Sequence, residues 1–142
     1  MPSAAEHRDK YDANRAFLNT GLAATNPEWA AVVAFYAAVH LIERLAAAER
    51  RGPVHHRTHI KRNAYLGGHR RHRVLAPHYV ELQLASEVSR YGTVHQFAKD
   101  YSASRVQSEL IDTHLVAVED YVTAHFAPPP PPAPPAPGAA GS

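Results

Sequence analysis

Apolar residues recur every three or four positions along most of the chain, while the strict alternation of a half-buried strand is missing. This spacing puts apolar side chains on one face of a helix and predicts an all-α domain. We expect a first helix from about Ala4 to Ala24. Asn26 and Pro27 favour the start of a second helix, because asparagine caps helices and proline suits the first helical position. The inner face of the first helix is expected to hold Tyr11, Phe17, Leu18 and Leu22.

The second predicted helix reads PEWAAVVAFYAAVHLIERLAAAERR and is apolar on nearly every side from Trp29 to Ile42. A helix without a polar face must be surrounded by the rest of the fold. We therefore expect it to be the central and most buried helix. Gly52 and Pro53 are expected to end it.

Three further helices are predicted downstream. One runs from about Thr58 to Leu66 and is closed by Gly67-Gly68, and the next starts near Pro77 and is broken at Gly92. The last helix is expected from about Ser102 to Phe126. The result is a bundle of four to five helices that spans residues 1–126. The last helix carries one apolar stripe, formed by Val106, Leu110, Leu115, Val118, Tyr121 and Val122.

The last sixteen residues, APPPPPAPPAPGAAGS, contain eight of the twelve prolines and no large apolar or charged side chain. Such a composition cannot contribute to a packed core and favours a solvated, polyproline-II-like segment. We expect residues 127–142 to be a disordered tail or spacer. The alternative is a ligand for an SH3-type or WW-type domain.

Composition narrows the possible chemistry. The chain has 142 residues, of which 45% are hydrophobic, and this is enough for one domain with a core. The absence of cysteine excludes disulfides, thiolate nucleophiles and cysteine-ligated zinc. The charged first residues lack the apolar run of a secretory signal, so we expect a cytoplasmic protein with no membrane partner.

Charge is distributed unevenly along the chain. Between Glu49 and Glu81 there is no acidic residue, whereas eight of the fifteen lysines and arginines lie there, a formal charge of +8. An ordinary solvated surface mixes both signs, so this segment favours a polyanionic partner such as RNA. A plain solvated surface is the alternative. The candidate phosphate-binding residues are Arg57, Lys61, Arg62, Arg70, Arg71 and Arg73.

A pair of histidines and one single histidine are candidate site residues. His55 and His59, at a spacing of four, could hold one zinc ion from a helix. The glutamate of an HExxH motif is missing and the neighbours are cationic, so we favour a basic loop and expect no metal and no cofactor. His40, inside the apolar helix, is expected to be a hydrogen-bonded core residue or to line a site.

The segment SRYGTVH places Arg90 and His95 five positions apart. A histidine that moves a proton and an arginine that holds charge on phosphorus can together cleave a phosphodiester beside a 2′-hydroxyl without a metal. Taken alone, a capping arginine followed by a loop histidine explains the same residues.

The order of features adds information. The helix containing FYAAVHLIERL, the HHRTHIKRNAYL segment, and YVELQLASEVSRY before a long final helix together resemble small prokaryotic HEPN-domain proteins. The similarity covers roughly residues 5–126 and is sharpest at residues 30–45 and 79–95.

The resemblance implies an up-and-down helical bundle that commonly forms a homodimer. Many members are metal-independent endoribonucleases, often toxins or defence effectors, with an arginine, four to six residues, and a histidine. By resemblance, Arg90 would bind phosphate and His95 would act as general acid and base in a dimer cleft, leaving a 2′,3′-cyclic phosphate. A nucleotidyltransferase-type antitoxin is then a possible partner.

Related HEPN proteins with the same arginine–tyrosine pair lack nuclease activity and bind a nucleotide, RNA or a partner protein. Tyr91, which directly follows Arg90, is structural in those chains and is expected to line the site here. Two hypotheses therefore stand: a homodimeric RNase, and a non-catalytic module that binds through its basic face.

Overall fold

A computed structural model describes residues 2–49 and 58–138 of the chain. Those residues contain helices and no strand, which confirms the all-α prediction. They form seven continuous helical stretches, so the expected number of four to five was wrong. The elements are α1 (Ala4–Leu18), α2 (Leu22–Thr25), α3 (Pro27–Glu49), α4 (His59–Gly68), η1 (His72–Leu75) continuing into α5 (Ala76–Tyr91), α6 (Val94–Asp100), and α7 (Ala103–Arg105) continuing through η2 (Val106–Leu115) into α8 (Val116–Phe126).

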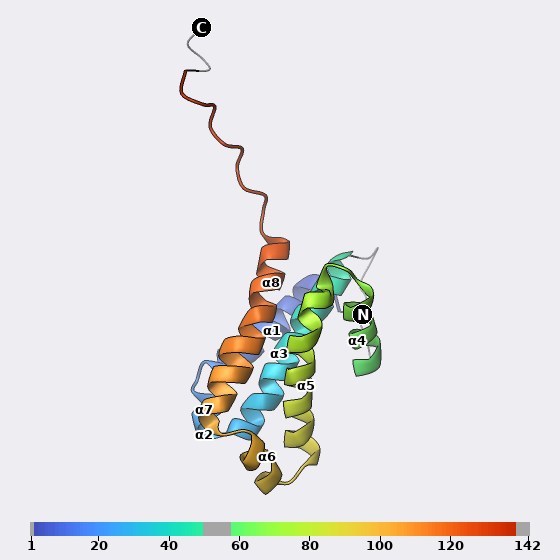
Figure 1. Ribbon diagram of the computed structural model, residues 1–142, viewed down its shortest axis with the longest axis vertical. Coiled ribbons are helices and arrows are strands. Elements are labelled where there is room, and N and C mark those ends of the chain that lie inside the picture. The colour runs from blue at the N-terminus through green and yellow to red at the C-terminus, as the bar shows by residue number, and fades with distance from the viewer. Residues whose placement is uncertain (1, 50–57, 139–142) are drawn as a thin grey trace.

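Helix α3 is the centre of the fold, as predicted. It packs against α1, α5 and the η2–α8 helix, and Figure 1 shows it in the middle of the bundle. Phe35, Ile42 and Leu45 on α3 are completely buried. The helix has the length and hydropathy (1.5) of a membrane span, but 83% of its apolar window is buried inside the protein. A core helix has the same composition, so the hydropathy is weak support for a span.

The first predicted helix is divided into two. α1 ends at Leu18, and Gly21, with φ of 83°, starts α2 in a new direction. Only glycine adopts this left-handed conformation without steric cost. The predicted inner face is correct for Leu18 and Leu22, which are buried, whereas Phe17 is 43% exposed and Tyr11 is half-buried.

The final helix has the predicted apolar stripe, with Val106, Leu110, Leu115, Val118 and Val122 buried. Its η2 part has π-helical pairing, in which residues five apart interact. Thr113 Oγ1 donates to the carbonyl of Ser108 at 2.7 Å, in agreement with this wider turn. Leu110, Ile111 and Leu115 are all buried along this part of the helix.

Helix α6 was not predicted. The amide N–H of Gly92 donates to Val88 and ends α5, and the Thr93 hydroxyl accepts from Gln96 and caps α6. Phe97 is 1% exposed and anchors this short helix to the core. The segment with Arg90 and His95 is therefore divided between two helices.

The part of the proline-rich segment that is described, residues 127–138, contains no helix and is exposed. Figure 1 shows it running away from the bundle after α8. The disorder expected for residues 127–142 stays a prediction.

Candidate functional site

Four polar side chains form a cluster between α3, α4 and α5. Arg62 Nε donates to Glu43 Oε1 at 2.8 Å, and both side chains are at most 6% exposed. Arg62 Nη1 also donates to the hydroxyl of Tyr79 at 3.0 Å. A buried charge needs such partners, because leaving it unpaired in the interior is costly. Arg62 was predicted to contact phosphate, but the fold places it inside, where its charge is directed at Glu43.

His59 is the fourth member of this cluster and lies half-buried in the first turn of α4. Its Nδ1 is 3.2 Å from the Tyr79 hydroxyl, and its ring centroid is 5.2 Å from that of Phe35. Burial lowers the pKa of His59, and the charges of Arg62 and Arg90 lower it further. The fold therefore brings His59 within the electrostatic influence of Arg90 and favours its neutral form.

Arg90 lies in the last turn of α5 and is half-buried. Its Nη1 donates to the hydroxyl of Tyr36 at 3.2 Å, and its Nε donates to the carbonyl of Ser86 at 3.4 Å. No described carboxylate forms an ion pair with it. The guanidinium is thus held in place by neutral groups while its charge stays available to an anion.

Exposed aromatic rings surround Arg90. Tyr36 is 37% exposed, and the Arg90 guanidinium lies 5.1 Å from the ring centroid of Tyr91, which is 79% exposed. Trp29, at 48% exposure, lines a cavity of about 350 Å³ together with Arg90 and Ser89. Ser89 connects α5 to the start of α3, since its hydroxyl donates to the carbonyl of Glu28 at 2.7 Å. One arginine and three exposed rings form what we call the Arg90 site: Trp29, Tyr36, Arg90 and Tyr91.

His95 is exposed in the first turn of α6. No hydrogen bond, ion pair or ring contact between the described residues joins it to Arg90. The histidine whose pKa is lowered by the charge of Arg90 is His59, on α4. The catalytic pairing of Arg90 with His95 stays a prediction.

The other predicted phosphate-binding residues are mostly at the surface. Lys61 is exposed on α4, and the exposed residues Arg70, Arg71 and Arg73 lie between α4 and α5. Arg73 Nε donates to the carbonyl of Gly67 at 3.3 Å, whereas none of these four cations has an ion-pair partner among the described residues. Arg57 lies outside the described residues, as does His55 of the possible zinc pair.

His40 is half-buried on α3 and faces α1. Its Nδ1 lies 3.2 Å from Nδ1 of His7, and the two rings are tilted at a centroid distance of 5.5 Å. One of these nitrogens must carry the proton for a hydrogen bond to form. The structure therefore gives His40 the structural contact expected of a core histidine.

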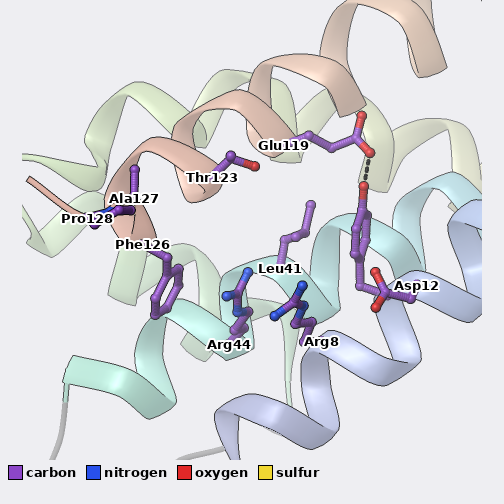
Figure 2. Close-up of a pocket in the computed structure, with 10 residues that line it drawn as sticks. Arg8, Asp12, Leu41, Arg44, Glu119, Thr123, Phe126, Ala127 and Pro128 are labelled. Atoms are coloured by element: carbon purple, nitrogen blue, oxygen red, sulfur yellow. Dashed lines mark hydrogen bonds between the residues drawn. The ribbon is translucent and has the colours of Figure 1, made fainter. Parts of the chain in front are cut away.

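A second pocket, of about 460 Å³, lies between α1, α3 and α8 (Figure 2). Arg8 and Arg44 point into it side by side, and no described carboxylate forms an ion pair with either. The Arg44 guanidinium is stacked 3.9 Å from the ring centroid of Phe126. Asp12 and Glu119 also line the pocket, so the charge of its wall is mixed. Sequence reasoning missed it, because only folding brings residues 36 positions apart together.

Sequence signals for the aromatic part of the Arg90 site were also weak. Trp29 and Tyr36 belong to the predicted core helix, where aromatic residues normally pack inside. Their exposed side chains distinguish Trp29 and Tyr36 from the buried residues around them on α3. This exposure is known only from the structure. Comparison of the chain with known protein families, with curated proteins and with solved structures gives no match.

Proposed function

We propose that this chain is a HEPN-like domain that binds single-stranded RNA at the Arg90 site. The observation that carries the proposal is the arrangement of Arg90, which has no acidic partner in the described part of the chain, among three exposed aromatic rings. Single-stranded nucleic acids bind to such sites because arginine contacts the phosphate and bases stack on the rings. Duplex recognition would need a different surface, such as a helix that enters a groove.

Surface charge supports the same proposal. Lys61, Arg70, Arg71 and Arg73 are exposed in the segment that has no acidic residue. Unpaired cations attract a polyanion over distances of about 10 Å at moderate ionic strength. In this account they contribute affinity, and the Arg90 site determines where the strand lies.

RNA cleavage without a metal is the second candidate function. It is favoured by the environment of His59, whose pKa is lowered first by burial and then by the charges of Arg62 and Arg90, so that its neutral form is favoured. A neutral imidazole can accept the proton of a 2′-hydroxyl while a guanidinium stabilises the charge on phosphorus. His95, which is exposed, would take part from a second copy of the chain in a homodimer. The possible nucleotidyltransferase-type antitoxin belongs to this second candidate.

The only tryptophan of the chain offers a direct experiment, since Trp29 lies beside Arg90. Titration with an oligouridylate should quench its fluorescence in a saturable way, because a stacked base changes the environment of the indole. The fitted affinity should fall as salt rises, with a log–log slope of about −0.7 for each phosphate contacted. Fluorescence that does not respond to RNA at any salt concentration would contradict the proposal.

A cleavage assay in EDTA separates the two candidates. Incubation of labelled RNA with the wild type, His59→Ala and His95→Ala should give a cyclic-phosphate product if the chain is catalytic. Loss of product in one variant identifies the acid–base residue. Saturable binding with intact RNA in every sample supports the non-catalytic module.

A further inference from the structure

A second group of polar side chains lies at the opposite end of α3, away from Arg90. Glu49 at the end of α3, His69 after α4 and His72 in η1 each offer one atom, and these atoms lie within 4.8 Å of one another. Such a set differs from the His55 and His59 pair considered from the sequence, since its members come from three parts of the chain.

His72 is the fixed member of the group. Its side chain is 3% exposed, its Nε2 lies 2.5 Å from Glu49 Oε1, and its Nδ1 lies 2.7 Å from the hydroxyl of Tyr121. The hydrogen bond at Nδ1 determines which way Nε2 points. Metal-binding histidines typically have this arrangement, in which a second group orients the ring through its other nitrogen.

Glu49 and His69 are exposed and can adjust. The Tyr65 hydroxyl donates to Glu49 Oε2 at 2.7 Å, which leaves Oε1 directed at His72. The His69 ring packs 5.3 Å from that of His72 and 4.7 Å from that of Tyr65. Ligand atoms of a tetrahedral zinc ion lie about 2.0–2.1 Å from the metal and so roughly 3.3 Å from each other. For this spacing the 2.5 Å between His72 Nε2 and Glu49 Oε1 must widen when the ion binds, and the donor atoms as a set already lie within 4.8 Å of one another.

His125, on α8, supplies a further nitrogen. Its Nε2 is 3.9 Å from Glu49 Oε1, and its ring meets that of His72 edge-on at 5.9 Å. The local set is therefore three imidazoles and one carboxylate. Nitrogen and carboxylate donors of this kind suit zinc, whereas magnesium and calcium prefer sites made of oxygen only.

We propose that Glu49, His69 and His72, with His125 as fourth ligand, bind a zinc ion that joins the end of α3 to η1 and α8. When the ion binds, the proton of the hydrogen bond between His72 Nε2 and Glu49 Oε1 is released to solvent. With four protein ligands the site is closed, so its role is structural. It is separate from the Arg90 site, and RNA binding does not depend on it.

The test is a titration of the full-length, metal-free protein with Zn²⁺ against a chromophoric chelator. We expect one zinc ion per chain, and a higher Tm with bound zinc because the ion stabilises the folded state alone. His69→Ala, at an exposed position, should abolish competition with the chelator while the circular dichroism stays that of the wild type. Tyr121→Phe, which removes only the group that orients His72, should weaken binding about 10- to 100-fold.

The matched control is His114→Ala, which removes another half-buried imidazole whose Nδ1 pairs with His78 at 3.0 Å. This variant should bind zinc like the wild type. The proposal is overturned if the wild type does not compete with the chelator, or if His69→Ala binds as tightly as His114→Ala. X-ray absorption of the zinc-loaded protein should show nitrogen and oxygen ligands with imidazole scattering, and the lack of imidazole scattering would also overturn it.

Discussion

Arg90 Nη1 donates a hydrogen bond to the hydroxyl of Tyr36, 54 positions earlier in the chain, at 3.2 Å. This contact joins the last turn of α5 to the middle of α3. The guanidinium is therefore anchored to the most buried helix of the fold. An arginine that is already in position loses less conformational entropy when it contacts phosphate.

Removing the Tyr36 hydroxyl should therefore weaken RNA binding while the ring stays available for stacking. For Tyr36→Phe we expect a loss of affinity of roughly two- to tenfold, because Arg90 is positioned less well while its own contact with phosphate remains. Fluorescence anisotropy of a labelled oligonucleotide measures it. Tyr91→Phe is the control, since no hydrogen bond of the Tyr91 hydroxyl is present among the described residues. Equal affinities of the two variants would mean that Tyr36 does not position Arg90.

The buried pair of Glu43 and Arg62 should dominate the local stability. Glu43→Ala leaves the Arg62 charge without its partner in the interior, and we expect the free energy of unfolding to fall by about 3–5 kcal/mol. Urea denaturation followed by circular dichroism gives the value. The control is Glu109→Ala, whose partner Arg105 is 51% exposed. A surface pair contributes at most about 1 kcal/mol, so similar losses in both variants would contradict the account.

Gly92 separates α5 from α6 at a point where the backbone leaves no space. A β-carbon there would lie 2.5 Å from the carbonyl oxygen of Val88. Gly92→Ala should cost about 1–3 kcal/mol of stability, as overpacking does elsewhere. In Gly67→Ala the added carbon meets nothing within 4 Å, so thermal unfolding should show little change. If the Gly92→Ala protein is as stable as the Gly67→Ala protein, the junction between α5 and α6 accommodates a β-carbon and the prediction is wrong.

Two histidines make stability depend on pH. Burial lowers the pKa of His59, helped by Arg62 and Arg90, and burial and His114 lower the pKa of His78 below its ordinary value of 6.5. Well above pH 6.5 both residues are neutral in the folded and unfolded chains, so they do not change the stability there. As the pH decreases from about 6.5 to about 5, the unfolded chain binds protons more readily than the folded chain. The free energy of unfolding should therefore fall over this range.

Urea midpoints measured across this range test the pH prediction. His78→Gln should reduce the fall, because one of the two titrating groups is gone. A wild-type midpoint that stays constant or rises as the pH is lowered from 6.5 would contradict it.

The sequence pattern predicted the parts of the fold that depend on long apolar stretches. The burial of α3 and the stripe from Val106 to Val122 follow directly from residue spacing. The break at Gly21 was missed because Leu18 and Leu22 keep helical spacing across it. Helix α6 was missed because its seven residues are fewer than the roughly 11–18 over which a helical period is recognised, and Phe97 is its single buried residue.

The candidate site could be predicted only in part. Arg90 was identified from its own segment, but its aromatic neighbours Trp29 and Tyr36 lie in a distant helix. The run of positive charge in the sequence predicted that Arg62 contacts phosphate. In the structure Arg62 is buried against Glu43, which is 19 positions away on another helix. Pairing between helices is a property of the fold, and counting charges in one segment does not detect it.

The most direct test of the central claim is the affinity of single-stranded RNA for Arg90→Gln, measured by fluorescence anisotropy beside the wild type. Arg105→Gln is the matched control, since it removes the same charge from an exposed position on α7 where Glu109 is the partner. We expect Arg90→Gln to bind about tenfold to a hundredfold more weakly, the worth of a charge-assisted hydrogen bond to phosphate. Arg105→Gln should stay near the wild type. If Arg90→Gln binds as tightly as Arg105→Gln, RNA does not bind at the Arg90 site.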